Sequence, residues 1–204
     1  MAEAFLLGED PTGTPRVISI LSSLVQRAAD RNDSLAAGRI QSPPNLVARA
    51  FLSPAKPAIS IRDYLDRIFL YSHCSPSCYV VAFIYLDRFL HFHPSLAVDS
   101  FNVHRLLITA VLTAVKFMED RFYDNAYFAR VGGISLAEMN YLEVDFLFGV
   151  RFELNVTPIV FTSYCSILQR EVNLLNPQIP PRMPCLPSEE EPCSNNCHNK
   201  QLTA

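Results

Sequence analysis

This chain has no excess of basic over acidic residues. Its 204 residues carry a net charge of -3 and the pI is about 5.9, so the surface lacks the positive charge that nucleic-acid-binding proteins use. The first residues lack the basic n-region of a signal peptide. The longest apolar run, from about Leu106 to Val115, is interrupted by two threonines and is too short to cross a bilayer. We therefore expect an intracellular protein of the nucleus and/or cytoplasm, with neither nucleic acid nor membrane as a partner.

Motifs that carry catalysis are also missing. The chain has no Gly-rich phosphate loop, no HExxH and no GxSxG sequence. An active site needs a nucleophile, a base and an orienting group in one pocket. The histidines lie at predicted helix ends or in the C-terminal tail, and they are His73, His91, His93, His104 and His198. These absences predict a protein that is not an enzyme and uses no cofactor and no small-molecule substrate.

The six cysteines do not predict a metal site or a disulfide framework. Three occupy apolar helical surroundings and three lie in the polar C-terminal segment; they are Cys74, Cys78 and Cys165, then Cys185, Cys193 and Cys197. Thiols of an intracellular protein need not be bridged. The spacing Cys193-x3-Cys197-His198 differs from the tighter, paired spacing of structural zinc sites. We therefore expect no metal.

What the chain does have is helical periodicity around an apolar core. Half of its residues are hydrophobic and 18% are charged, which fits a packed domain. Strand signals are weak, and helix caps are recognisable at Ser60, Ser75-Pro76 and Ser135, with Glu138 completing a capping box. The expected helices begin at about residues 16, 60, 76, 102, 124, 135 and 158, and the first of them ends at about residue 30. The prediction is an all-α fold with five helices around one core and flanking helices at both ends.

The same pattern divides the chain into four parts. Residues 1–57 form a flexible lead, an amphipathic helix and a proline-containing connector, and residues 58–155 form the bundle. Residues 156–175 form a C-terminal helix. Residues 176–204 are rich in Pro, Ser, Glu and Asn without an apolar period, so we expect a disordered tail.

Several ionisable residues lie in the most apolar helices. Asp87 and Arg88 belong to a helix that is hydrophobic on nearly all sides, and a charge there is costly unless it has a partner. Arg62, on a neighbouring helix, is the candidate partner of Asp87. Lys116 and Glu143 lie among apolar neighbours on two further helices. Together they can offer a paired donor and acceptor to the backbone groups of a partner helix.

Four short motifs in this order resemble the cyclin box. They are Ile61-Arg62-x-x-Leu65, Tyr85-Leu86-Asp87-Arg88-Phe89-Leu90, Lys116-Phe117-x-Glu119 and Leu142-Glu143-x-x-Phe146-Leu147. The resemblance covers roughly residues 58–155, and the combination is far more specific than any single motif. The short length and the Phe122-Tyr123-Asp124-Asn125 loop are similar to the plant P-type (U-type) cyclins, relatives of the fungal phosphate-signalling cyclin.

The resemblance implies a regulatory subunit that binds and activates a cyclin-dependent protein kinase, in cell cycle or cell division control or in phosphate signalling. In that family the residues at Lys116 and Glu143 contact the kinase and hold its regulatory helix in the active orientation. The implied surface also includes Phe117, Glu119 and Phe146, and extends to Phe83 and Phe89. The residues at Arg62 and Asp87 pair inside the box.

Two features limit how far the resemblance extends. Cell-cycle cyclins build a substrate-docking patch around a methionine and a tryptophan on the first box helix. Here Ile61 takes the first place, Tyr64 replaces an aliphatic residue and the chain has no tryptophan. A second cyclin box is missing beyond the helix that starts at Pro158. An alternative hypothesis is a cyclin-box adaptor that binds a non-kinase protein without activating a kinase.

Overall fold

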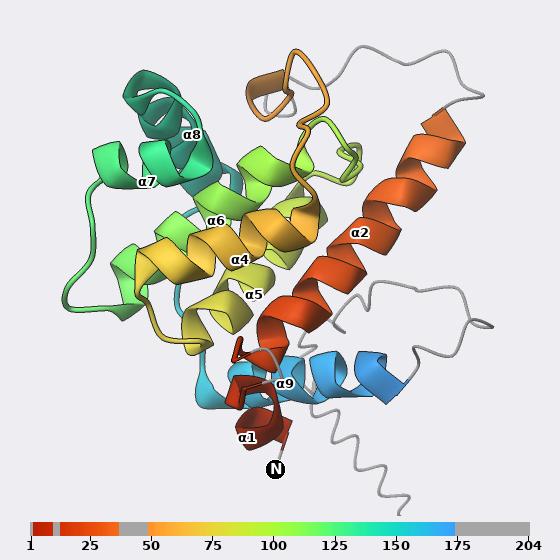
Figure 1. Cartoon of the computed structure of the whole chain (residues 1–204), viewed down its shortest axis with the longest axis vertical. Helices are drawn as coiled ribbons and strands as arrows, with labels where there is room; N and C mark the ends of the chain where they lie inside the picture. Colours follow the sequence, from red (N-terminus) through yellow and green to blue (C-terminus); the bar gives the residue numbers. More distant parts are fainter. Residues whose placement is uncertain (1, 10–12, 37–48, 174–204) are drawn as a thin grey trace, which may run out of the picture.

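The computed structural model describes residues 2–9, 13–36 and 49–173, and these residues form a bundle of α-helices (Figure 1). In chain order the helices are α1 (Ala2–Leu7), α2 (Arg16–Ala36), α4 (Ile61–Ser72), α5 (Ser77–Phe92), α6 (Val103–Met118), α7 (Asn125–Gly132), α8 (Leu136–Gly149) and α9 (Pro158–Asn173). Within the described ranges the β-type pairing is limited to one isolated bridge between Glu9 and Pro15. The all-α prediction is confirmed. The predicted disordered tail, residues 176–204, lies outside the described residues.

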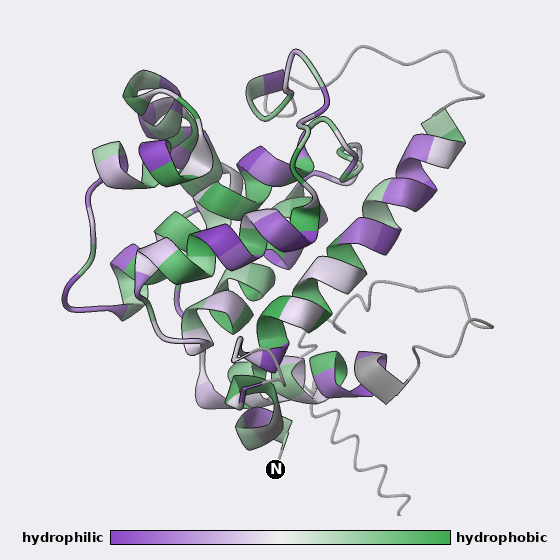
Figure 2. Ribbon diagram, viewed as in Figure 1, coloured by the Kyte–Doolittle hydropathy of each residue, from purple (hydrophilic) through white to green (hydrophobic). Residues whose placement is uncertain are grey.

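Helices α5 and α6 form the centre of the bundle. Buried residues occur on nearly every side of α5 and along most of α6, as expected for helices that are apolar all round. Around them pack α4, α7 and α8, and α2 lies obliquely across α4 and α5 (Figure 1). Figure 2 shows hydrophobic and hydrophilic residues alternating along α2, which fits a helix with one face against the bundle. None of the described helices is long and apolar enough to cross a membrane.

Local capping signals place the starts of three helices. The hydroxyl of Ser60 accepts from the N–H of Asp63, and that of Ser135 accepts from the N–H of Glu138. The carboxylate of Asp124 does the same for Tyr127 at the start of α7. These bonds satisfy N–H groups that have no partner within the helix. The predicted Ser75 cap is not formed, because α5 begins at Ser77 after Pro76 and has no side-chain cap.

The N-terminal segment is more ordered than the sequence predicts. The expected flexible lead contains α1, whose Leu6 is fully buried and which packs against α9. A helix of six residues is marginal by itself, so this tertiary contact stabilises it. Helix α2 also runs six residues beyond its predicted end. Its last turns are tied to the α5–α6 connection, where Asn32 donates to the carbonyl of Val98 and Asp33 accepts from the N–H of Ser100.

Candidate functional site

The structure brings Lys116 and Glu143 together. Lys116 lies in the last turn of α6, Glu143 lies at the middle of α8, and Lys116 Nζ is 2.6 Å from Glu143 Oε1. The two residues are separated by 27 positions in the chain, so the packing of α6 against α8 creates the pair. The charge-assisted bond compensates each residue for its partial loss of water.

A third residue fixes the geometry of this pair. Asn125, the first residue of α7, donates from Nδ2 to Glu143 Oε2 at 2.7 Å and to Asn140 Oδ1 at 2.7 Å. Both carboxylate oxygens of Glu143 therefore have a protein partner. Since the three groups come from α6, α7 and α8, the packing of three helices sets the orientation of the charged pair.

The pair retains the capacity to bind a partner. The Lys116 side chain is 29% exposed and that of Glu143 is 15% exposed, so each presents an edge to solvent. An ammonium group has three donors, and each carboxylate oxygen has two lone pairs. Lys116 can therefore donate to further carbonyl oxygens, and Glu143 can accept from further N–H groups, without breaking the bond between them.

Apolar side chains are exposed on the helix that carries Glu143. Tyr141, Val144 and Phe148 lie at positions i, i+3 and i+7 of α8, which places them on one stripe of the helix. Their exposed fractions are 60%, 50% and 68%, and Phe148 packs edge-on against the exposed Phe152 with ring centroids 5.2 Å apart. Exposed apolar groups gathered in this way are typical of a protein-binding surface. We call Tyr141, Val144, Phe148 and Phe152 the α8 stripe.

The other residues predicted for this surface divide into two groups. Phe117 is half exposed, directly beside Lys116. The carboxylate of Glu119 accepts from the N–H of Ser75 and from the thiol of Cys78, so it ties the end of α6 to the α4–α5 connection. These two side chains lie at the end of α6 that carries Lys116.

Phe146 does not belong to the surface, and this prediction is wrong. Its side chain is fully buried and stacks on Phe89 with ring centroids 4.9 Å apart and an interplanar angle of 8°. Phe89 is fully buried as well, and Phe83 is 7% exposed, so neither presents a binding surface. Phe51 completes the cluster from outside the bundle helices, 5.2 Å from Phe89. These rings form the core beneath the α8 stripe.

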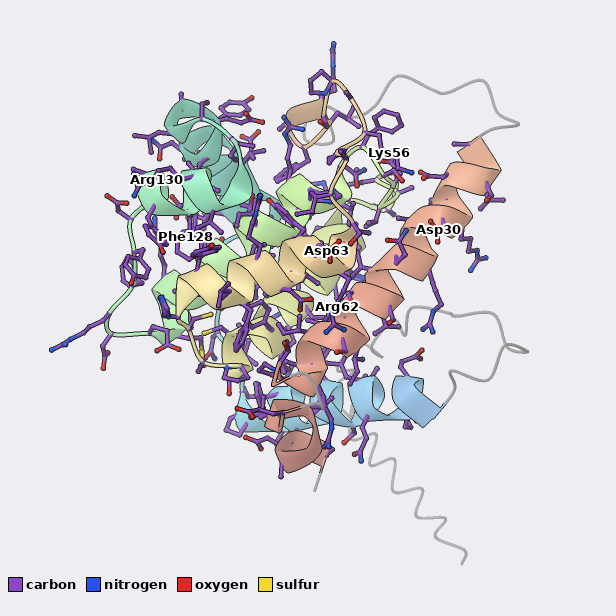
Figure 3. All side chains as sticks on the ribbon, in the orientation of Figure 1. Asp30, Lys56, Arg62, Asp63, Phe128 and Arg130 are labelled. Atoms are coloured by element: carbon purple, nitrogen blue, oxygen red, sulfur yellow. The ribbon has the colours of Figure 1, made fainter. Side chains whose placement is uncertain are left out.

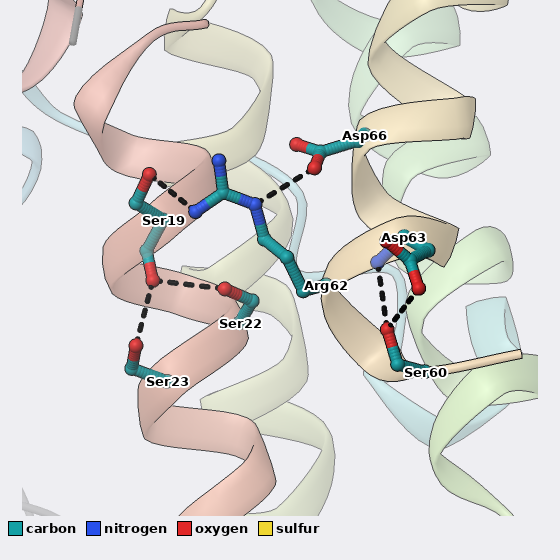
Figure 4. A network of polar contacts seen from close by, with 7 residues as sticks. All are labelled: Ser19, Ser22, Ser23, Ser60, Arg62, Asp63 and Asp66. Atoms are coloured by element: carbon teal, nitrogen blue, oxygen red, sulfur yellow. Dashed lines mark hydrogen bonds and ion pairs between the residues drawn. The ribbon is translucent and has the colours of Figure 1, made fainter. Parts of the chain in front are cut away.

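The predicted Arg62–Asp87 ion pair is not formed. Arg62 points from α4 toward α2 (Figure 3), where its Nη1 donates to Ser19 Oγ at 2.6 Å (Figure 4). Its Nε donates to Asp66 Oδ2, on α4 itself, at 2.8 Å. Asp87 instead accepts a 2.6 Å hydrogen bond from the hydroxyl of Tyr164 on α9. Arg62 therefore bonds to the carboxylate of Asp66, one helical turn away, instead of that of Asp87. Through Ser19 it links α4 to α2 and does not enter the core.

Asp87 should make folding stability depend on pH. Burial raises the pKa of its carboxyl above the usual value, although the Tyr164 hydroxyl acts in the opposite direction. The folded state therefore keeps this proton to a higher pH than the unfolded chain. Its contribution to stability is fully present below the unfolded pKa and is lost as the pH rises through the folded pKa. Asparagine has no charge to desolvate, so Asp87→Asn should gain stability relative to wild type as the pH rises.

Urea denaturation of both proteins at about pH 4 and about pH 7 measures this effect. We expect the difference in unfolding free energy, variant minus wild type, to be larger at the higher pH. A difference that is the same at both values would show that Asp87 titrates alike in the folded and unfolded chain.

The position of a substrate-docking patch is closed. Ile61 and Tyr64 on α4 are 4% and 2% exposed. The Tyr64 ring packs edge-on against His104, and its hydroxyl donates to the carbonyl of Gly132. A peptide therefore cannot reach these two side chains. The described part of the chain also contains no group of three or more potential ligands that would hold a metal ion. Cys193, Cys197 and His198 lie outside that part.

Two elements of the site were not found from the sequence. Asn125 gave no signal, because a polar residue at the start of a helix resembles a cap. The α8 stripe was hidden because apolar residues occur on every side of α8, so the sequence does not show which of them are buried. The spacing of Tyr141, Val144 and Phe148 at i, i+3 and i+7 was the available signal, once Phe146 is assigned to the core.

The family model and the relatives that match this chain are all cyclins. A family model described as Cyclin matches residues 15–154. Cyclin-P4-1 of Oryza sativa subsp. japonica is 60% identical over 194 residues, which cover 94% of this chain and 91% of the rice protein. Cyclin-U4-1 of Arabidopsis thaliana is 54% identical over 169 residues, covering 83% of this chain and 82% of the Arabidopsis protein.

Proposed function

Because this chain belongs to the cyclin family, and has a regulatory role of that kind, we propose that it binds and activates a cyclin-dependent protein kinase through the surface around Lys116 and Glu143. This surface consists of Lys116, Glu143, Phe117 and the α8 stripe. We propose that the complex acts in the nucleus or cytoplasm, in cell division control or in phosphate signalling.

The observation that carries the proposal is the geometry of the Lys116–Glu143 pair. Both side chains keep an exposed edge, so the pair can contact a partner while it joins α6 to α8. The hydrogen bond from Asn125 Nδ2 orients the Glu143 carboxylate, so the pair has its geometry before a partner binds. Preorganised groups lose less conformational entropy on binding, which favours affinity. The pair suits the backbone N–H and C=O groups that are unpaired at the end of a partner's helix.

The apolar residues provide the remaining part of a binding surface. Aromatic residues contribute strongly at the centres of protein interfaces, where water is excluded. Phe148 and Phe152 are 68% and 57% exposed and lie near one another, and Phe117 is 50% exposed beside Lys116. Phe117 directly follows Lys116 in the chain, so its burial by a partner would remove water close to the ion pair. Electrostatic interactions of the pair with the kinase would then be stronger than in solvent.

Activation requires no chemistry from this chain. A kinase whose regulatory helix exchanges between two orientations shifts toward the one that its partner binds better. In the active orientation the lysine–glutamate ion pair of the kinase is in place for ATP. Binding energy from the Lys116–Glu143 surface supplies the difference between the two orientations. A shift from a mostly inactive to a mostly active population needs about 5.5 kcal/mol of differential binding.

A reconstituted kinase assay tests the proposal. Purified cyclin-dependent kinases are assayed for phosphate transfer to a peptide with and without this chain, and co-purification measures binding separately. We expect one or more of the kinases to bind the chain and to become active only in its presence. Kinase binding without activation would contradict the activating role. Neither binding nor activation across the kinases would contradict the proposal and favour the adaptor that binds a non-kinase protein.

A further inference from the structure

A serine followed by proline lies in the connection that leads into α4. Ser53 is partly exposed, and the three residues after it are exposed. Residues 52–60 form neither helix nor strand. The Ser53 N–H donates to the carbonyl of Phe101 at 2.7 Å, so the serine has a fixed place beside the connection that precedes α6. Within the described residues the Ser53 hydroxyl itself makes no hydrogen bond.

The main chain after Ser53 is available to another protein. The connection is tied to the bundle through Ser53 and Phe101, and again through the carbonyl of Ile59, which lies 3.0 Å from His104 Nε2. Between these two ties, in the part of the chain that the structure describes, the backbone of residues 54–58 makes no hydrogen bond. Proteins that bind an extended peptide do so largely through its main chain. This segment can make such contacts without breaking hydrogen bonds of its own.

The residues after Ser53 indicate the class of enzyme that fits. Proline has no N–H, so a substrate groove without an acceptor at that position admits proline, whereas any other residue would bury an unpaired donor there. The ammonium group of Lys56, three residues after Ser53, can pair with a carboxylate. Kinases distinguish their substrates by such charge patterns. Ser53-Pro54-Ala55-Lys56 therefore fits a proline-directed protein kinase whose substrate groove carries an acidic side chain.

Ser53 differs from the other Ser-Pro and Thr-Pro sequences of the chain. These sequences begin at Thr14, Ser42, Ser53, Ser75 and Thr157, and the one at Ser53 alone has a basic residue three positions later. The Thr157 hydroxyl accepts from the N–H of Val160 at the start of α9, and the Ser75 hydroxyl lies 3.6 Å from the Cys78 thiol. Phosphorylation of either hydroxyl would disturb its contact, whereas the Ser53 hydroxyl has no contact to lose.

We propose that Ser53 is the phosphorylation site of a proline-directed Ser/Thr kinase. The Ser53 oxygen attacks the γ-phosphorus of ATP, a P–O bond forms, the bond from that phosphorus to the bridging oxygen breaks, and ADP leaves. The proton of the hydroxyl passes to the aspartate of the kinase's catalytic loop. The phosphoserine carries a charge of about −1.5 to −2 at neutral pH, on a connection that two hydrogen bonds hold in place.

Phosphopeptide mapping of the folded, full-length chain tests the proposal. The chain is incubated with ATP and a cyclin-dependent kinase that is already bound to its own activating cyclin, so the result does not depend on the function proposed above. Trypsin does not cleave between Lys56 and Pro57 and therefore releases residues 50–62, in which fragmentation distinguishes Ser53 from Ser60. We expect one phosphate on this peptide, at Ser53. The other four Ser-Pro and Thr-Pro sequences should be modified at least about tenfold more slowly.

Variants of the two recognition residues complete the test. Ser53→Ala should remove the phosphate from residues 50–62. Lys56→Ala should slow phosphorylation of Ser53 by at least about tenfold, and Lys56→Arg, the matched control that keeps the charge, should retain it. Since Lys56 is exposed and lies outside the helices, neither of its variants should affect folding.

Three results would overturn the proposal. They are a Ser53 that stays unmodified in the folded chain, a phosphate on Ser60 or on another Ser-Pro or Thr-Pro sequence in preference to Ser53, and a Lys56→Ala variant that is modified at the wild-type rate. A synthetic peptide of residues 47–62 is assayed beside the folded chain. Modification of the peptide alone would also overturn the proposal, because it would show that the folded connection does not present Ser53 to a kinase.

Discussion

Replacement of Phe146 by alanine should lower the free energy of unfolding by about 3–5 kcal/mol. The side chain is fully buried, stacks on Phe89 and meets Phe51 edge-on, so truncation leaves a cavity that these two aromatic rings line. The neighbouring backbone has little room to adjust, because Gly149 packs directly onto the Phe89 ring. We expect incomplete collapse of the cavity and a cost near the upper end of that range. Urea denaturation followed by circular dichroism measures it.

Phe148→Ala is the matched control on the same helix. Phe148 is 68% exposed, so its truncation should change the stability by less than about 0.5 kcal/mol. The same substitution should weaken kinase binding by about 2 kcal/mol, roughly thirtyfold, if the ring is buried by the kinase. Equal losses of stability in the two variants would contradict the division of α8 into a buried side and a binding stripe.

Removal of the Lys116–Glu143 pair should have the largest effect on function. In the variant Lys116→Ala/Glu143→Ala the partner groups at a desolvated interface lose their donors and acceptors, which costs about 2–5 kcal/mol of binding free energy. Affinity for the kinase should therefore fall by at least about tenfold. The stability cost should stay near 1 kcal/mol, because the two charges are removed together and were only partly buried.

The chain supplies a closely matched control for this variant. Arg105 and Glu138 form a second ion pair between α6 and α8, with Arg105 Nε 2.6 Å from Glu138 Oε1 and similar exposure, at the first turns of both helices. Arg105→Ala/Glu138→Ala should cost comparable stability without loss of kinase binding. If both double variants bind the kinase with wild-type affinity, the interface lies elsewhere on the molecule.

The helices were predictable because their signals are local. Ser60, Asp124 and Ser135 lie at the starts of the helices that they cap, and each forms its bond within three residues. Lys116 and Glu143 were predicted to act together because both are charged residues among apolar neighbours, and their contact with a kinase was predicted from the resemblance to the cyclin box. Helix α1 could not be predicted, because its stability comes from contact with α9, at the other end of the chain.

Partners across long sequence separations were the main source of error. Asp87 needs a partner, and the sequence does not show that the hydroxyl of Tyr164 on α9, 77 positions away, lies within reach of it. The partner of Arg62 was available locally, because Asp66 follows it by four residues on the same helix. The spacing of residues in the sequence also could not show that Phe146 is buried and Phe148 exposed. Both lie on a helix that is apolar nearly all round, so the buried side became evident only from its packing on Phe89.

An exchange of the two charges tests the central claim most directly. The variant Lys116→Glu/Glu143→Lys keeps an ion pair between α6 and α8, so its fold and melting temperature should remain near those of the wild type. It presents the opposite pattern of donors and acceptors to a partner. Isothermal titration calorimetry with the kinase that the wild-type chain activates should therefore show the same loss of affinity as the double alanine variant, at least about tenfold. Wild-type affinity in the exchanged variant would show that the pair only braces the bundle, and would contradict the proposed function of this surface.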